Sequence, residues 1–376
     1  MIHWLRLLNF RAYEEVELEL DASFNRVIGP NGVGKTSLLE AITHVGFGAS
    51  PWSGRSSDVV TEGKTYAVIS GKGATRKQDV SVKVKYGGHK EVLLAGKKIP
   101  RLSQLLGIFP MTAIGPQEIE LVKGSPGVRR RMIDSVICQM DSEYTQALNR
   151  FKKFIVNRGA AIRGIKSGEM AGGHILIESL DETIAPDVGI IMEMRSRFVE
   201  KISKISAGIY TEMTADEGGE LAISYNPTIK TEGMGPGDIS KSYLERLAAR
   251  RKRDIEAGET VLGPHRDDLL FEKDGESMSR FGSWGQARAA SIAALLAASE
   301  IMHSSSSEKD KNSSSVSLLL DDCFAELDPD ITTRFIEIVA RYGQVILASP
   351  RPIEPPSGSP GAVFTFDGVG KIRKES

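Results

Sequence analysis

The stretch GPNGVGKTS, residues 29–37, decides how the rest of the chain is interpreted. It fits the pattern G-x-x-x-x-G-K-[ST] and joins an expected strand, FNRVI at 24–28, to an expected helix that begins SLLEAITHV. Glycines let successive backbone N–H groups surround a phosphate, Lys35 adds a positive charge, and the Thr36 hydroxyl can bind Mg²⁺. This context favours a P-loop over an ordinary glycine-rich turn. The predicted nucleotide-binding residues are Gly29, Asn31, Gly32, Gly34, Lys35, Thr36 and Ser37.

A second motif, SLLLDDCFAELD at 317–328, contains the acids that a P-loop requires. An apolar strand would bring Asp321 to its C-terminal end, where the carboxylate can hold Mg²⁺ and its water shell. Asp322 follows directly and is the candidate for orienting or deprotonating the attacking water. Two acids that cap a solvent-facing strand are the alternative interpretation.

The run FGSWGQARAASIAALLAASE at 281–300 begins with Ser283, Gly285 and Gln286 around Trp284 and continues as an Ala-rich, buried helix. A Ser hydroxyl, glycine N–H groups and a helix N-terminus form a good anion site. In ABC-type ATPases such a Ser-x-Gly-Gln/Gly segment faces the γ-phosphate held by another subunit. The order of P-loop, helical insertion, S-x-G-Q and acidic strand fits ABC-type heads and is unexpected in a kinase or a small GTPase. A simple helix cap is the alternative, and both interpretations can hold.

Two further residues are catalytic candidates. Gln117, in IGPQEIELVKG at 114–124, lies where a loop would sense the γ-phosphate. Ser349, after the strand QVILA, occupies the switch position where many ABC ATPases have His, and its hydroxyl is a poor base. In GPHRDDLLF at 263–271, an Arg–Asp pair that staples a turn and a functional role are equal alternatives.

Strand-like sequence dominates to about position 115 and includes an expected hairpin at 80–94. After Ser125-Pro126, apolar residues recur at spacings of three and four as far as Ile155, which predicts one long amphipathic helix. Strand character returns at 269–278 around an Asp274-Gly275 turn, and 304–317 is an expected polar loop. The predicted domains are 1–122 (ATPase lobe, N-terminal part), 123–258 (inserted helical lobe) and 259–376 (the rest of the ATPase lobe).

The composition describes a soluble globular chain of roughly two domains, with 376 residues, 40% hydrophobic and 26% charged. No stretch approaches the roughly 20 apolar residues of a membrane span, and the first 15 residues lack the apolar core of a signal peptide. Cys138 and Cys323 lie far apart, so we expect free thiols in a reducing cytoplasm. A net charge of −1 means that any polyanion binding requires a local basic patch.

Together these motifs resemble the RecF family of bacterial recombinational repair proteins, relatives of the heads of structural-maintenance-of-chromosomes ATPases. The resemblance implies an α/β fold: an ABC-type P-loop ATPase head, with a mixed β-sheet and a P-loop helix, into which a mainly helical second lobe is inserted. The matching segments, in the family's order, are LRLLNFRAYEEVEL, GPNGVGKTSLLEAI, SGRS at 53–56, LVKGSPGVRRRMID, TVLGPHRDDL, SWGQ and LLLDDCFAELD.

The resemblance further implies a weak, DNA-stimulated ATPase that sandwiches two ATP molecules with Mg²⁺ between two subunits. It implies binding of duplex and gapped DNA, and loading of a RecA-type recombinase with RecR-type and RecO-type partners. The family pattern assigns Lys35 and Thr36 to nucleotide, Asp321 and Asp322 to Mg²⁺ and hydrolysis, and Ser283 to the γ-phosphate of the partner subunit. Two departures are Trp284, where the family usually has a polar residue, and Ala287, where it often has Gln.

Direct support for DNA binding comes from two clusters of cations. Four consecutive cations wrap most of the way around a helix, so they cannot all face one duplex, and a solvated surface with intramolecular ion pairs is the equal alternative. We expect salt-sensitive binding dominated by the DNA backbone. The candidate residues are Arg129, Arg130, Arg131, Arg250, Arg251 and Arg253.

The resulting hypothesis is an ATP-driven dimer that grips DNA and uses slow hydrolysis as a release timer. One alternative is the nucleotide-binding subunit of an ABC transporter, which would need an apolar surface for membrane helices. The other is a clamp that binds ATP without hydrolysing it.

Overall fold

The computed structural model describes residues 1–50, 59–75, 79–170, 172–215, 219–307, 316–324, 327–354 and 361–375. The SGRS segment at 53–56, most of the expected loop at 304–317 and residues 325–326 of the acidic motif lie outside these ranges. The chain divides into two compact units. The first unit comprises Met1–Ile119, Gly208–Gly218 and Ser283–Ser376, and the second comprises Glu120–Ala207 and Gly219–Gly282.

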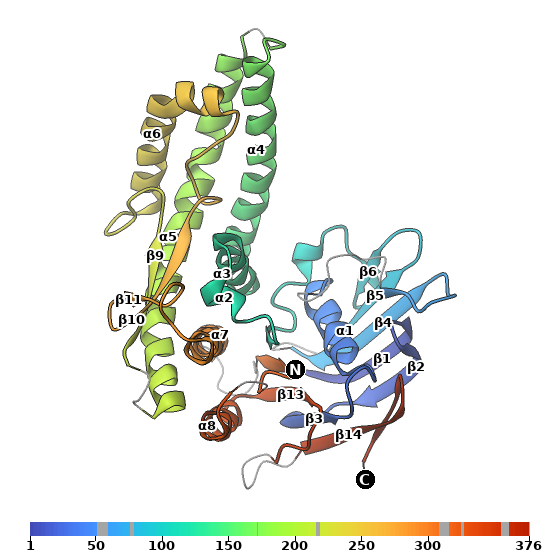
Figure 1. Ribbon diagram of the computed structural model, residues 1–376. Helices are drawn as coiled ribbons and strands as arrows, with labels where there is room; N and C mark the ends of the chain where they lie inside the picture. Colours follow the sequence, from blue (N-terminus) through green and yellow to red (C-terminus); the bar gives the residue numbers. More distant parts are fainter. Residues whose placement is uncertain are drawn as a thin grey trace. The chain divides into compact units, whose positions relative to one another are not determined.

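The first unit contains two six-stranded sheets, drawn in Figure 1. One is antiparallel, with the order β2-β1-β4-β5-β6-β7. Its strands alternate in burial, as in β5, because one face packs on the core and the other meets water. The bounds are β1 (Ile2–Phe10), β2 (Tyr13–Glu19), β4 (Ala67–Ala74), β5 (Asp79–Tyr86), β6 (Glu91–Leu94) and β7 (Lys97–Lys98).

The other sheet is mixed, with the order β15-β14-β3-β13-β12-β8. Every neighbouring pair is parallel except β14 and β15, which are antiparallel. Every residue of β12 and β13 is buried, as expected for parallel strands that are covered on both faces. The bounds are β3 (Phe24–Ile28), β8 (Met111–Ile114), β12 (Ser317–Asp321), β13 (Gln344–Ser349), β14 (Gly361–Gly368) and β15 (Lys371–Lys374).

Helix α1 (Lys35–Phe47) lies between the two sheets, since it contacts β4 and β5 of the first and β12 and β13 of the second. Its residues Leu38, Leu39 and Ile42 are fully buried in a core to which both sheets contribute. The N-terminus of α1 is therefore fixed by packing on both sides. The other helices of this unit are the 3-10 helix η2 (Leu102–Gln104), α7 (Trp284–Ser307), which packs against β8, and α8 (Pro329–Val339).

The second unit is mainly helical and carries a small antiparallel sheet with the order β11-β10-β9. A buried Arg158 bridges Asp181 and Asp254 at 2.7 and 2.8 Å, which ties three of its segments together. The bounds are α2 (Glu120–Lys123), α3 (Pro126–Met140), α4 (Ser142–Lys166), α5 (Gly173–Thr214), α6 (Pro236–Ala257), β9 (Leu221–Asn226), β10 (Asp268–Lys273) and β11 (Glu276–Ser277).

The structure confirms several local predictions and corrects one. The hairpin at 80–94 is the β5–β6 pair, and the Asp274-Gly275 turn joins β10 to β11. The single long helix after Ser125-Pro126 is wrong, because the chain is extended at Asp141 and forms α3 and α4 instead. The Asp141 side chain accepts a hydrogen bond from the Tyr144 N–H, so it caps the second of these helices.

Strands β9, β14 and β15 have no counterpart in the sequence prediction. Because β9 pairs with β10, residues 259–282 belong to the second unit, whereas the predicted division counts them with the ATPase lobe. Within the part of the chain that the structure describes, Cys138 and Cys323 form no disulfide, as expected.

Candidate nucleotide site

The parallel strands of the mixed sheet end at one edge, and the predicted site residues follow those ends. In the register, Ile28 lies opposite Ser349, and Ala348 lies opposite Asp321. The P-loop, Ser349 and Asp321 are therefore side by side at the carboxyl ends of β3, β13 and β12. This edge is where open α/β sheets bind their ligands. The first unit alone supplies all of these residues.

The P-loop has the backbone conformation that its glycines permit. Gly32 and Gly34 have φ angles of +85° and +117°, which side chains with a Cβ rarely adopt. Gly34 is also the residue before α1, so the loop leads directly into the helix N-terminus. The glycine-rich backbone and the positive end of a 13-residue helix are thus adjacent, an arrangement that suits a phosphate.

Two contacts hold this loop from outside, and the sequence analysis did not assign either. The Tyr13 hydroxyl donates a 2.8 Å hydrogen bond to the carbonyl of Gly34. The Gly370 N–H, in the turn between β14 and β15, donates a 3.0 Å hydrogen bond to the carbonyl of Val33. Both carbonyls are thereby hydrogen-bonded to groups outside the loop. Tyr13 belongs to the LRLLNFRAYEEVEL segment that matches the family, but the sequence does not indicate that it contacts Gly34.

The Lys35 ammonium lies among the loop's own oxygens. It donates to the carbonyls of Gly29 and Pro30 at 2.7 and 2.9 Å and lies 3.5 Å from Oδ1 of Asn31. Burial lowers the pKa of Lys35, while the charges of Asp322 and Asp321 act in the opposite direction. A cation with two carboxylates nearby is the electrostatic arrangement expected beside a triphosphate and a metal ion.

Asp321 is buried at the end of β12, and burial raises its pKa. A hydrogen bond with the Thr36 side chain and the charge of Lys35 partly oppose this rise. The hydroxyl at the start of α1 and the carboxylate at the end of β12 are therefore neighbours. Mg²⁺ prefers oxygen ligands, so Thr36 and Asp321 are the residues that would hold it beside a bound phosphate.

Asp322 has a left-handed backbone with φ of +46°, an uncommon conformation for a residue other than glycine. Its N–H donates to the carbonyl of Ala348, which holds the chain in this conformation as it leaves β12. Strain of this kind gathers at functional sites. The Asp322 side chain is half-exposed, whereas every residue of β12 before it is buried.

Ser349 and Gln117 stand at two other strand ends. Ser349 is buried, its carbonyl accepts from the Gly29 N–H at 3.3 Å, and its hydroxyl accepts from the Arg351 N–H at 3.2 Å. Gln117 is exposed in the turn between β8 and α2. The neighbouring Glu118 accepts a hydrogen bond from the Gly115 N–H, and burial raises its pKa to about 8. Glu118 is absent from the sequence prediction.

The predicted signature segment is a reciprocal helix cap. The Ser283 hydroxyl accepts from the Gln286 N–H at 3.2 Å, and the Gln286 side chain accepts from the Ser283 N–H at 3.0 Å. Ser283 and Gly285 are exposed, and Trp284 is 67% exposed. The cap interpretation is therefore correct, and the same residues remain accessible at the N-terminus of the 24-residue α7.

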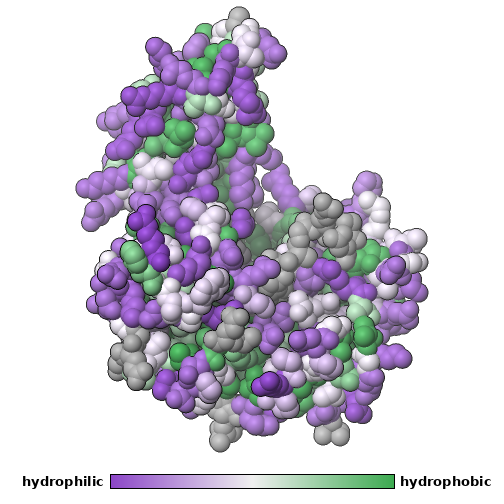
Figure 2. Space-filling model, in the orientation of Figure 1, coloured by the Kyte–Doolittle hydropathy of each residue, from purple (hydrophilic) through white to green (hydrophobic). Residues whose placement is uncertain are grey.

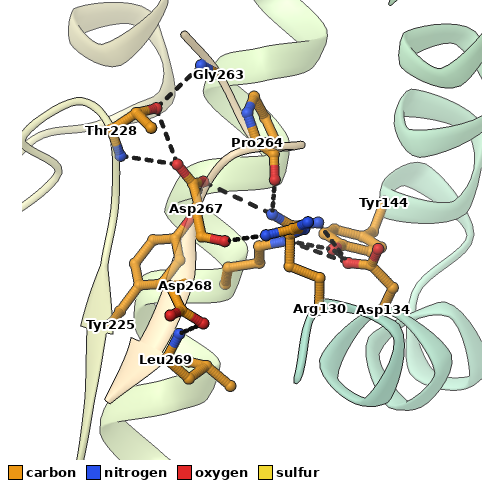
Figure 3. A network of polar contacts seen from close by, with 11 residues as sticks. Arg130, Asp134, Tyr144, Tyr225, Thr228, Gly263, Pro264, Asp267, Asp268 and Leu269 are labelled. Atoms are coloured by element: carbon orange, nitrogen blue, oxygen red, sulfur yellow. Dashed lines mark hydrogen bonds and ion pairs between the residues drawn. The ribbon is translucent and has the colours of Figure 1, made fainter. Parts of the chain in front are cut away.

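The arginines proposed for DNA differ in their surroundings. Arg129 is buried and donates to both carboxylate oxygens of Asp268 at 2.6 and 3.0 Å, so its guanidinium is engaged inside the second unit. Arg130 donates to the Asp267 carbonyl at 2.5 Å (Figure 3). Arg131 is exposed. On α6, Arg250 is half-buried, Arg251 lies 3.7 Å from Glu178, and Arg253 is exposed.

In the GPHRDD segment, Arg266 pairs with Glu259 at 2.6 Å, while Asp267 takes part in a buried polar network. Asp267 accepts from the backbone and hydroxyl of Thr228 at 2.8 and 2.9 Å and from the Tyr225 hydroxyl, as Figure 3 shows. The fully buried Arg195 donates to the Pro264 carbonyl and to Asp134. Burial raises the pKa of Asp267. This network fixes the start of β10 against α3 and α5.

A family model described as the RecF/RecN/SMC N terminal domain matches residues 1–352. The chain is 31% identical over 349 residues to "DNA replication and repair protein RecF" of Moorella thermoacetica, covering 92% of this chain and 88% of that protein. It is 30% identical over 375 residues to the protein of the same name from Clostridium tetani, covering 99% and 94%.

The fold is also similar to solved structures. The structure described as the recombination mediator protein RecF-ATP in the RecFOR pathway has a TM-score of 0.88 and 26% identity, covering 100% of this chain and 97% of that one. An SmcHead bound to the C-winged helix domain of ScpA has a TM-score of 0.59 and 17% identity, covering 100% and 97%, which is a likeness of fold alone. The predicted fold class, an ABC-type ATPase head with a helical insertion, is confirmed.

Proposed function

The chain belongs to the RecF family of DNA replication and repair proteins, and on that premise we propose that it binds ATP and, in an ATP-dependent manner, DNA. The observation that carries the proposal is the sheet edge where the P-loop, Asp321 and Asp322 follow neighbouring strands around the charge of Lys35. The ATP named in the similar RecF structure supports the choice of nucleotide.

The residues at this edge have distinct roles in the proposed hydrolysis. The P-loop N–H groups and Lys35 bind the phosphates, and the Thr36 and Asp321 oxygens, which are neighbours, hold Mg²⁺. The metal ion supplies charge neutralisation on the phosphate oxygens. Asp322 orients the attacking water, and its short carboxylate is consistent with slow turnover. Ser349 and Gln117 stand at strand ends where they can report whether the γ-phosphate is present.

We further propose that ATP joins two copies of the chain in a sandwich. Ser283 and Gly285 are exposed at the start of a long helix, so the hydroxyl, the N–H groups and the helix dipole are available to an anion on another subunit. The dimer would be the DNA-gripping form, and hydrolysis would act as a release timer. RecR-type and RecO-type mediators, a RecA-type recombinase and gapped DNA are the proposed partners.

Exposed cations of the second unit are the proposed DNA contacts. Arg131 and Arg253 are exposed, whereas Arg129 is engaged with Asp268. Contacts of this kind neutralise phosphates and do not read bases, so binding should weaken steeply with salt.

Two alternatives from the sequence remain testable. None of the helices in the described ranges has the length and apolar character of a membrane span. The face of the molecule in Figure 2 is dominated by hydrophilic residues, with small apolar areas between them, so this face is not suited to docking on the membrane helices of a transporter. Single-turnover hydrolysis with and without DNA distinguishes an ATPase from a clamp that only binds ATP.

Analytical ultracentrifugation with and without ATP tests the proposal. The wild type should dimerise with ATP, and gapped DNA should bind the dimer more tightly than single-stranded DNA does. Lys35→Arg and Ser283→Arg should both prevent dimerisation, the first through ATP binding and the second at the interface. Ser179→Arg, on an exposed position of α5, is the control for adding a cation. Dimerisation of Ser283→Arg at wild-type affinity would contradict the sandwich.

A further inference from the structure

Lys123, the last residue of α2, is surrounded by backbone carbonyls. Its ammonium donates to Gly282 at 2.5 Å and to Met278 at 2.9 Å, and lies 3.4 Å from the carbonyl of Ser279. An ammonium has three donors, and here each points to a carbonyl of the same short segment. Lys123 lies in the LVKGSPGVRRRMID segment, and its sequence context predicts no role for it.

The segment that Lys123 holds is a closed turn. The Phe281 and Gly282 N–H groups donate to the carbonyls of Ser277 and Met278 at 2.9 and 3.2 Å. The Met278 carbonyl therefore accepts from both the Gly282 N–H and Lys123, and the ammonium adds a cationic donor to the carbonyls of this turn. A Cβ on Gly282 would lie 2.8 Å from the Met278 carbonyl oxygen, which leaves the turn little freedom. Gly282 immediately precedes Ser283.

The neighbouring cations on α3 hold the strand that leads into this turn. Arg129 pairs with Asp268 at the start of β10, and Arg130 donates to the Asp267 carbonyl (Figure 3). The stretch from Lys123 to Arg130 therefore fastens the segment 267–282 at both ends. The end at Gly282 is covalently joined to Ser283, and the end at Asp267 lies in a buried polar network.

We propose that Lys123 is a positioning residue for the signature segment. By fixing the three carbonyls before Ser283, it sets the direction in which the chain enters α7 and thus where the Ser283 hydroxyl is presented to a partner subunit's nucleotide. The inference rests on the proposed ATP sandwich.

The test compares Lys123→Met with Arg150→Met. Arg150 is a matched control, because it also makes cationic hydrogen bonds within the second unit, and its partner at 2.6 and 2.8 Å is Asp187 on α5. Titration of dilute, monomeric protein with a fluorescent ATP analogue measures binding by one subunit alone. Sedimentation with ATP measures dimerisation, and steady-state hydrolysis gives KM and kcat.

We expect Lys123→Met to bind the analogue like the wild type but to dimerise about tenfold more weakly, as for the loss of one charge-assisted hydrogen bond. The kcat should fall while KM for ATP changes little, and Lys123→Arg should restore part of the loss. Gly282→Ala distorts the same turn without removing a charge and should act in the same direction. Gly282→Ala also tests the proposal if Lys123→Met does not fold.

Two results would overturn the inference: wild-type dimerisation of both Lys123→Met and Gly282→Ala, or an equal loss of dimerisation in Arg150→Met, which would indicate general loosening of the second unit. A wild-type protein that stays monomeric with ATP would instead refute the sandwich, and the role of Lys123 would fall with it.

Discussion

Lowering the pH should destabilise the nucleotide-binding unit through one buried histidine on the P-loop helix. His44 lies on α1, where its Nδ1 shares a 2.7 Å hydrogen bond with the Tyr86 hydroxyl and the rings of Phe10 and Tyr86 pack around it. Burial lowers the pKa of His44 to about 4, and the positive charges of Lys90 and Arg11 contribute to the same shift. The folded unit therefore holds this side chain neutral.

The sign and size of the effect follow from the two pKa values. An unfolded histidine has a pKa of about 6.5, so between pH 6.5 and 4 the unfolded chain binds a proton that the folded chain does not. Stability is thus complete above about pH 6.5 and is lost as the pH falls. At pH 5 the loss amounts to about 2 kcal/mol, and it approaches about 3 kcal/mol below pH 4.

Urea denaturation of the wild type and of His44→Asn at pH 7.5 and pH 5.0 measures this contribution. Asn keeps an acceptor near the position of Nδ1 but does not titrate. Buried carboxyls with raised pKa values, such as Glu118 and Asp321, stabilise the folded protein as the pH falls. They are present in both proteins, so their effect cancels in the difference. The wild type should lose about 2 kcal/mol more than the variant.

An equal pH dependence in the two proteins would refute the reasoning, because the titrating group would then lie elsewhere. Proton NMR provides an independent check, since the His44 ring resonance should remain untitrated at pH 5.5. A midpoint near pH 6.5 would show that burial does not shift this pKa in solution.

Three other changes probe the support of the site and its surface. Gly370→Ala should lower the stability of the first unit by about 2 kcal/mol or more in thermal unfolding, because the φ of Gly370 is +70° and a Cβ there would lie 1.9 Å from a backbone oxygen. Gly368→Ala, in the same hairpin, should be nearly neutral, because the nearest atom to its Cβ would lie at 3.8 Å. Equal Tm values for the two variants would contradict this prediction. Tyr13→Phe should raise KM for ATP about fivefold with kcat little changed, as expected for the loss of about 1 kcal/mol from one hydrogen bond to the P-loop. An unchanged KM would show that the P-loop keeps its conformation without this hydrogen bond. Arg131→Ala should weaken DNA binding and reduce by about 1 the slope of log binding constant against log salt concentration. Arg129→Ala should instead unfold the second unit, because it leaves the Asp268 carboxylate without its partner. Unaltered DNA binding in Arg131→Ala would exclude a contact between Arg131 and DNA.

Much of the nucleotide site could be predicted because its signals are local. The P-loop lies between its strand and its helix, and Asp321 ends a buried strand, since each motif carries its own flanking pattern. The Ser283 cap was likewise visible in four consecutive residues. A periodicity of three and four, however, does not detect one extended residue, so the break at Asp141 was missed.

The remaining features depend on partners that are remote in sequence. Arg129 looks like a surface cation until Asp268, 139 positions away, is brought to it. Lys123 meets its carbonyls across 155 and 159 positions, and no backbone carbonyl carries a sequence signal. The Gly370 contact with the P-loop requires β14, a strand that pairs in parallel with β3. These are consequences of tertiary packing and not of local pattern.

The placement of β3 between β13 and β14 has a consequence for synthesis of the protein on the ribosome. The P-loop strand leaves the ribosome early, yet both of its neighbours in the sheet come from beyond position 343. A nascent chain therefore carries a strand with two unpaired edges until nearly the whole sequence has been translated. Pairing across some 320 residues is slow to form. A product that stops before Gly370 would lack the hydrogen bond that this residue donates to the P-loop.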